Sequence, residues 1–103
     1  MKIKLNVTRK HIMSGDCGDI NSCAIAQAVA DQFAGAMVKV GGTVEVYNSS
    51  GNIVLQSHLP VKALNFMERF DSCDGGWSVT NKDIEKAKRK LKPVSFTLDF
   101  QVV

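Results

Sequence analysis

The chain has 103 residues, 45% of them hydrophobic and 22% charged, with a net charge of +3, a composition that is typical of globular proteins and excludes a disordered chain. No apolar run approaches the roughly 20 residues that cross a bilayer, and the start MKIKLNVTRKH lacks the apolar segment of a signal peptide. We therefore expect one domain over residues 1–103, located in the cytoplasm and without a membrane partner. Its three cysteines are expected to be free thiols.

The first third of the sequence predicts a strand, a connection and a helix. Apolar and polar residues alternate in KIKLNV, residues 2–7, as in a half-buried strand. The stretch 7–19 is rich in Gly and Asp near its end and is expected to be a connection. Apolar residues at helical spacing from about 22 to 33 predict a helix. The candidates for its N-cap are Asp19, Asn21 and Ser22.

The middle of the sequence predicts extended chain followed by a second helix. Residues 37–47 are expected to be extended, with a turn or bulge at Gly41-Gly42. NSSG, residues 48–51, separates two β-rich runs and predicts a hairpin. Pro60 suits the first turn of the helix that follows. The apolar stripe expected on this helix consists of Val61, Ala63, Leu64, Met67 and Phe70.

The last quarter of the sequence predicts a basic helix and a closing strand. Thr80 and Asp83 have the spacing of a capping box. The buried stripe expected after them consists of Ile84, Ala87 and Leu91. Pro93 stops the helix, and residues 94–102 alternate again as a strand.

The order of these elements is β-α-β-β-α-(α)-β. It predicts the α+β class, with a four-stranded, mainly antiparallel sheet and two to three helices on one face. A ferredoxin-like, or split βαβ, arrangement fits this order best.

One histidine and three cysteines raise the question of a metal or thiol site. His11, Cys17 and Cys23 are spaced too widely for the close cysteine pairs of structural zinc, and Cys73 is remote in sequence. We therefore expect neither a metal site nor a cofactor. Cys23 near a helix start could be a nucleophile, but no histidine accompanies it in a nucleophile motif. A metal- or thiol-dependent enzyme is the least favoured alternative, and the protein is expected not to be an enzyme.

The strongest surface feature is the density of basic residues in 82–92, which hold six basic and two acidic groups. Such a helix is either a solvated outer face or a contact for phosphates or an acidic protein. No interleaved aromatics or base-reading motif accompany it, so sequence-specific recognition is not predicted. Trp77 is a candidate anchor beside it. The predicted partner-binding residues are Lys82, Lys86, Lys88, Arg89, Lys90 and Trp77.

The segments VTRKHIMSGDCGDINSCAIAQAV, LPVKALNFMERFD and PVSFTLDF together resemble small proteins encoded by bacteriophages and bacterial mobile elements. Cys17 and Cys23 are further apart here than in that group, and Ala24 stands in place of a proline. The resemblance implies a non-enzymatic accessory protein in the host cytoplasm. It would bind and modulate or inhibit a host protein or ribonucleoprotein complex, as anti-CRISPR proteins do. The alternative is a nucleic-acid-binding module that uses the basic helix.

Overall fold

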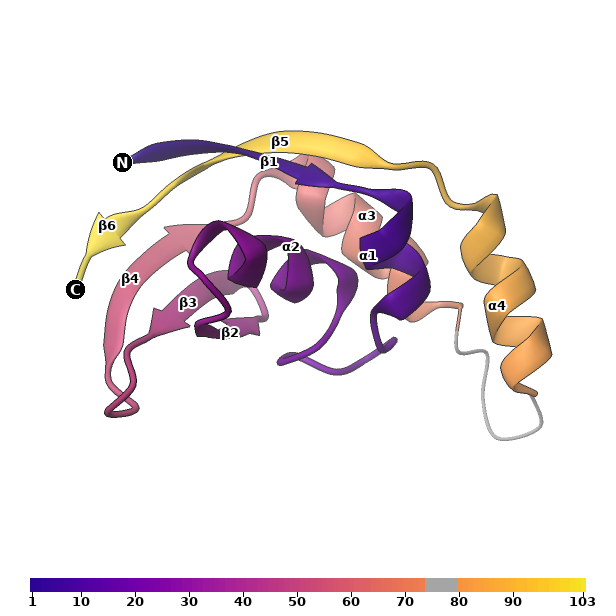
Figure 1. Ribbon diagram of the computed structural model, residues 1–103. Coiled ribbons are helices and arrows are strands. Elements are labelled where there is room, and N and C mark those ends of the chain that lie inside the picture. Colours follow the sequence, from indigo (N-terminus) through magenta and orange to yellow (C-terminus); the bar gives the residue numbers. More distant parts are fainter. Residues whose placement is uncertain (74–79) are drawn as a thin grey trace.

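The computed structural model describes residues 1–73 and 80–103, which form six strands and four helices (Figure 1). In chain order these are β1 (Lys2–Val7), α1 (Arg9–Ser14), α2 (Ala24–Gln32), β2 (Met37–Val40), β3 (Thr43–Tyr47), β4 (Ile53–His58), α3 (Val61–Asp71), α4 (Asn81–Lys90), β5 (Val94–Asp99) and β6 (Gln101–Val102). The α+β class expected from the sequence is thereby confirmed.

The strands form two antiparallel sheets. β1 pairs with β5 along its whole length, and the other sheet has the order β2-β3-β4-β6. Only Phe100 separates β5 from β6, so one run of chain pairs first with β1 and then with β4. Figure 1 shows this run as a single curved path that joins the two sheets. The two sheets are therefore linked through residues 94–102.

Helix α2 lies between the two sheets, with β1 and β5 on one side and β2 and β3 on the other (Figure 1). Its alanines at 24, 26 and 28 are buried together with Ile25 and Val29, so the helix is enclosed on most of its circumference. Small side chains permit this close approach of strands from both sides. The largest side chains of the resulting core are Leu5, Ile12, Ile25, Phe70, Leu98 and Phe100.

The strands do not adopt the expected ferredoxin-like arrangement within one four-stranded sheet, because they are divided between two sheets. The turn expected at Gly41-Gly42 is confirmed, and it reverses the chain so that residues 37–47 form the two paired strands β2 and β3. A second tight turn joins β3 to β4, with the Asn48 carboxamide accepting from the backbone N–H groups of Ser50 and Asn52. These short connections make β2, β3 and β4 consecutive neighbours, and β1 pairs with β5 alone.

Part of the expected connection between the first strand and the first long helix is itself helical. Thr8 caps α1, its side chain accepting from the His11 N–H, while the His11 ring accepts from the Thr8 N–H at 3.0 Å. A histidine at the third helical position thus takes the place that Glu or Gln occupies in the usual capping box. Helix α2 begins later than expected. Its N-cap is Cys23 rather than Asp19, Asn21 or Ser22.

The two later helices bury only some of the residues expected. In α3 the predicted Ala63 and Phe70 are buried. In α3, Val61 and Leu64 are exposed, and Phe66 packs inward beside Phe70 at a ring-centroid distance of 6.1 Å. In α4 the capping box of Thr80 and Asp83 is confirmed. The stripe of Ile84, Ala87 and Leu91 is only half-buried, and the buried residue of the helix is Lys88.

Candidate anion-binding groove

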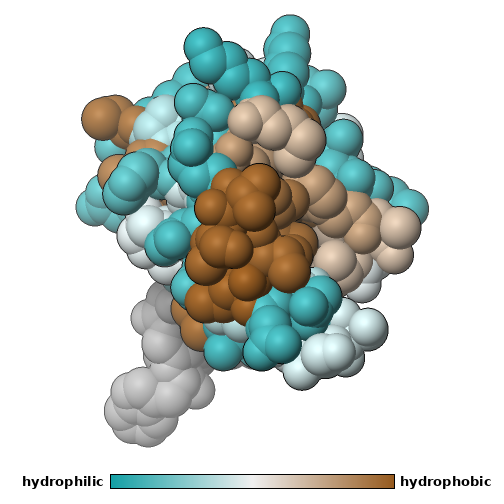
Figure 2. Space-filling model, turned by 90° about the vertical axis from the view of Figure 1, so that its left-hand side faces the viewer, coloured by the Kyte–Doolittle hydropathy of each residue, from teal (hydrophilic) through white to brown (hydrophobic). Residues whose placement is uncertain are grey.

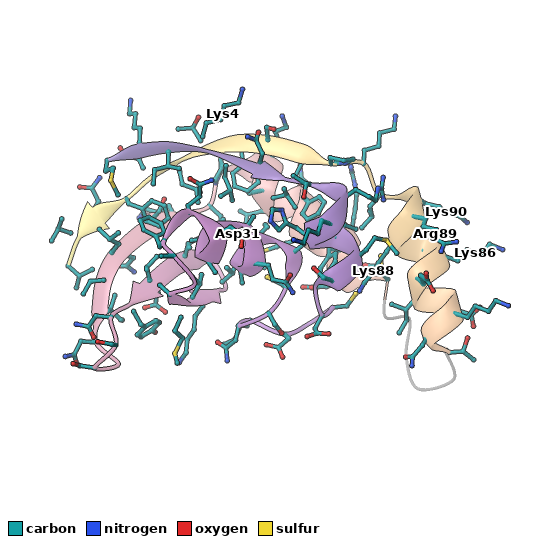
Figure 3. The ribbon with its side chains drawn as sticks, viewed as in Figure 1. Lys4, Asp31, Lys86, Lys88, Arg89 and Lys90 are labelled. Carbon is teal, nitrogen blue, oxygen red and sulfur yellow. The ribbon has the colours of Figure 1, made fainter. Side chains whose placement is uncertain are left out.

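The predicted contact residues of α4 do not share one environment. Figure 3 shows Lys86, Arg89 and Lys90 directed away from the body of the protein, while Lys88 points back toward α1. The Arg89 guanidinium donates to Glu85 at 2.7 Å, which partly neutralises its charge. Lys82 and Lys86 are exposed, in a hollow that they share with Asp83 and Glu85. Lys90 is exposed as well, and none of these three lysines makes an ion pair among the described residues.

Lys88 is an internal residue. Its side chain is 8% exposed, and its ammonium group donates to the backbone carbonyls of Gly15 and, at 3.4 Å, of Met13. The same nitrogen lies 5.6 Å from the ring centroid of Phe70. The carbonyls are those at the C-terminal end of α1, where helices lack intrahelical donors. The prediction of Lys88 as a partner-binding residue is wrong because its charge is already used to hold α1 against α4.

Arg9 makes the reciprocal contact from α1 to α4. Its guanidinium donates to the carbonyls of Lys88 at 3.0 Å and Leu91 at 2.6 Å. Cations at helix C-termini satisfy free carbonyls and oppose the negative end of the helix dipole. Each of the two helices is thus capped by a cation of the other. This exchange fixes the position of α4 and of the side chains that it carries.

Two adjoining hollows lie along α3 and α4. One, of about 450 Å³, is lined by Lys62, Asn65, Phe66, Arg69, Lys90, Lys92, Pro93 and Val94. The other, of about 350 Å³, is lined by Arg69, Ser72, Cys73, Asp83, Lys86, Ala87 and Lys90. Both hollows are lined by Arg69 and Lys90, so they adjoin at these two side chains. We call their cations the basic groove, which consists of Lys62, Arg69, Lys86, Lys90 and Lys92.

The cations of the basic groove are not paired with acids within the part of the chain that the structure describes. No ion pair or side-chain hydrogen bond involves any of the five cationic groups there. The one acidic lining residue, Asp83, is held by Thr80, whose N–H and hydroxyl donate to its carboxylate at 3.3 and 2.9 Å. Like charges gathered in a concave surface concentrate their field and attract anions.

The sequence predicted only the α4 half of this groove. Lys62 and Arg69 are seven residues apart on α3 and therefore lie on one helical face. That spacing is a weak signal by itself, because isolated lysines and arginines are common on solvated helices. Lys92, in the connection between α4 and β5, adds a further cation to the groove. Packing of α3 beside the start of β5 brings these cations together. Trp77, the predicted anchor, lies outside the described residues.

The candidate metal ligands are not gathered into one cluster. The His11 ring, which accepts from the Thr8 N–H, bonds the Asp31 carboxylate at 2.7 Å through its other nitrogen. Because Nδ1 accepts, Nε2 carries the ring hydrogen and donates it in the hydrogen bond to Asp31. The Cys23 sulfur accepts from the Ala26 N–H. Among the residues described, no group of three or more His, Cys, Asp or Glu side chains is placed to hold a metal ion.

The cysteine environments disfavour thiolates. Burial raises the pKa of the thiol of Cys23, the candidate nucleophile, which is the N-cap of α2. Burial also raises the pKa of Cys73, although the positive charge of Lys88 and a hydrogen bond with Cys17 act in the opposite direction. The two thiols therefore stay protonated to a higher pH than free cysteine. This environment does not support a thiol-based reaction.

A separate apolar patch lies over β4 and β6, on the face drawn in Figure 2. The side chains of Val102 and Val103 are 86% and 67% exposed, and they adjoin Val54 and Leu55 through the pairing of the two strands. The patch is formed when β4 and β6 pair, which places Leu55 opposite Val102. No helix in residues 1–73 or 80–103 is long and apolar enough to span a membrane.

Comparisons with protein-family models, with curated proteins and with solved structures find no match to this chain.

Proposed function

We propose that this chain is a non-catalytic binding protein that docks its basic groove against an anionic surface of a host complex and thereby modulates or inhibits that complex. The observation that carries the proposal is the set of five cations without acidic partners that line one concave surface. The cations of Lys88, Arg9 and Arg89, in contrast, are already used for packing or pairing. Cations that serve no internal contact are available to a partner.

The chemistry of the remaining residues supports binding rather than catalysis. The buried thiols have raised pKa values, and His11 is tied into a capping box and to Asp31. The resemblance to small phage and mobile-element proteins adds the expectation that the partner belongs to host defence, such as a CRISPR complex. In that role the groove would cover a surface that the complex needs for its own substrate.

A capture experiment with matched variants tests the proposal. Tagged wild-type protein is expected to retain a discrete complex from bacterial lysate, and R69Q/K90Q is expected to retain at most one tenth as much. Removal of two charges from the shared part of both hollows weakens every anion contact there. The control is K2Q/K4Q, which removes the same charge from exposed positions on β1, outside the groove. Equal retention by R69Q/K90Q and the wild type would refute the assignment of the groove.

A further inference from the structure

The basic groove has the form of a track rather than of a single anion site. Arg69 and Lys90 line both of its hollows, while Lys62 and Lys92 line only the larger one and Lys86 only the smaller one. A single anion would be held by a few donors that converge on one point. Cations distributed along two adjoining hollows instead match negative charges that repeat along a chain.

The lining also indicates how such a chain would be contacted. Besides its cations, the larger hollow is lined by the apolar side chains of Pro93 and Val94 and by the carboxamide of Asn65. No aromatic ring among the described lining residues is exposed for base stacking, since Phe66 is buried. The groove thus presents cations to a backbone and little that would read a base.

The concave shape distinguishes between two kinds of polyanion. The carboxylates of a folded acidic protein stand on a broad surface, which would meet the outward side of α4 with Lys82 and Arg89. Lys82, Lys86 and Arg89 share a hollow with Asp83 and Glu85 on that side, and Arg89 is paired with Glu85. The larger hollow of the basic groove has no acidic lining residue, and a thin strand can enter it between Lys62, Arg69, Lys90 and Lys92. Hollows of about 450 and 350 Å³ hold a few nucleotides of one strand but not a duplex about 20 Å wide.

We propose that the basic groove binds the sugar–phosphate backbone of single-stranded nucleic acid, with phosphates seated between Arg69 and Lys90 and the neighbouring lysines. This inference rests on the proposed function and names the anionic surface of the host complex as an exposed nucleic-acid strand. Binding depends on charge and has little base preference. Neutralising three to five phosphates gives a slope of about −2 to −3.5 for log K against log salt.

Fluorescence anisotropy with a labelled 12-nucleotide oligouridylate tests this inference on the full chain. We expect wild-type protein to bind at low salt with that slope, R69Q/K90Q to bind at least tenfold more weakly, and K2Q/K4Q to stay within about twofold of wild type. An oligothymidylate of the same length is expected to bind comparably. An equal loss of affinity for the oligouridylate in both double variants would overturn the inference, because the net charge of the protein alone would then account for binding.

A competitor separates nucleic acid from acidic protein. Unlabelled oligouridylate is expected to displace the probe, and polyglutamate at the same concentration of charge is expected to displace at most one tenth as much. Equal displacement by polyglutamate would overturn the inference in favour of an acidic polypeptide. A complex captured through the groove that survives nuclease, together with no oligonucleotide binding, would overturn this inference alone. Failure of groove-dependent capture would instead refute the proposed function.

Discussion

Replacing Gly15 with alanine is expected to lower the free energy of unfolding by about 3 kcal/mol, because the added methyl group has no space. A Cβ at this position would lie 2.7 Å from the backbone nitrogen of Ala24 and 2.9 Å from the carbonyl oxygen of His11. Both atoms belong to the backbone, so no side-chain rotation relieves the contact. The connection from α1 to α2 would have to move away from the start of α2.

Urea denaturation of G15A and of a matched control measures this effect. Gly41 is the control, because a Cβ there meets nothing within 4 Å and its φ is not in the left-handed region. G41A is expected to change the free energy of unfolding by less than about 1 kcal/mol. A G15A variant as stable as G41A would show that the α1–α2 connection is not packed as described.

Replacing Lys88 with methionine is expected to lower the free energy of unfolding by about 2 kcal/mol. The substitution keeps an apolar chain of similar length but leaves the carbonyls of Gly15 and Met13 without their donor. A buried acceptor that loses its partner costs about 1–3 kcal/mol, offset in part because the ammonium group no longer has to be desolvated. Loss of this contact also weakens the packing of α4 against α1, and α4 carries the groove cations Lys86 and Lys90.

The control for K88M is K86M, which removes an exposed ammonium group two residues away on the same helix. K86M is expected to stay within about 0.5 kcal/mol of wild type in urea denaturation. Equal stability of the two variants would contradict the internal role of Lys88. The pair also separates stability from function, because K86M is expected to weaken binding without unfolding the protein.

Local patterns in the sequence predicted the strands well, because period-two alternation of burial is present in β1, β2, β3 and β5. The Thr80–Asp83 capping box was predicted for the same reason, since both partners lie within one helical turn. Helix α1 was missed. It is short, and the third helical residue of its capping box is His11, a residue type that also fits a loop.

The division into two sheets and the groove depend on contacts between distant residues, which local patterns do not encode. The pairing of β1 with β5 joins positions more than eighty residues apart, such as Val7 and Val94. Lys88 is the clearest failure, because lysine is rarely buried and its neighbours on α4 are exposed cations. Only the position of α1 shows that this one lysine faces carbonyl groups. Likewise, Lys62 and Arg69 join the α4 cations through packing alone.

Hydrogen–deuterium exchange of the protein, alone and bound to its captured complex, tests most directly whether the basic groove is the functional surface. We expect slower exchange in peptides that cover residues 62–69 and 86–92 on binding, with little change in residues 53–55 and 101–103. Protection confined to the apolar patch on β4 and β6, with the groove unchanged, would contradict the account and assign binding to that patch instead.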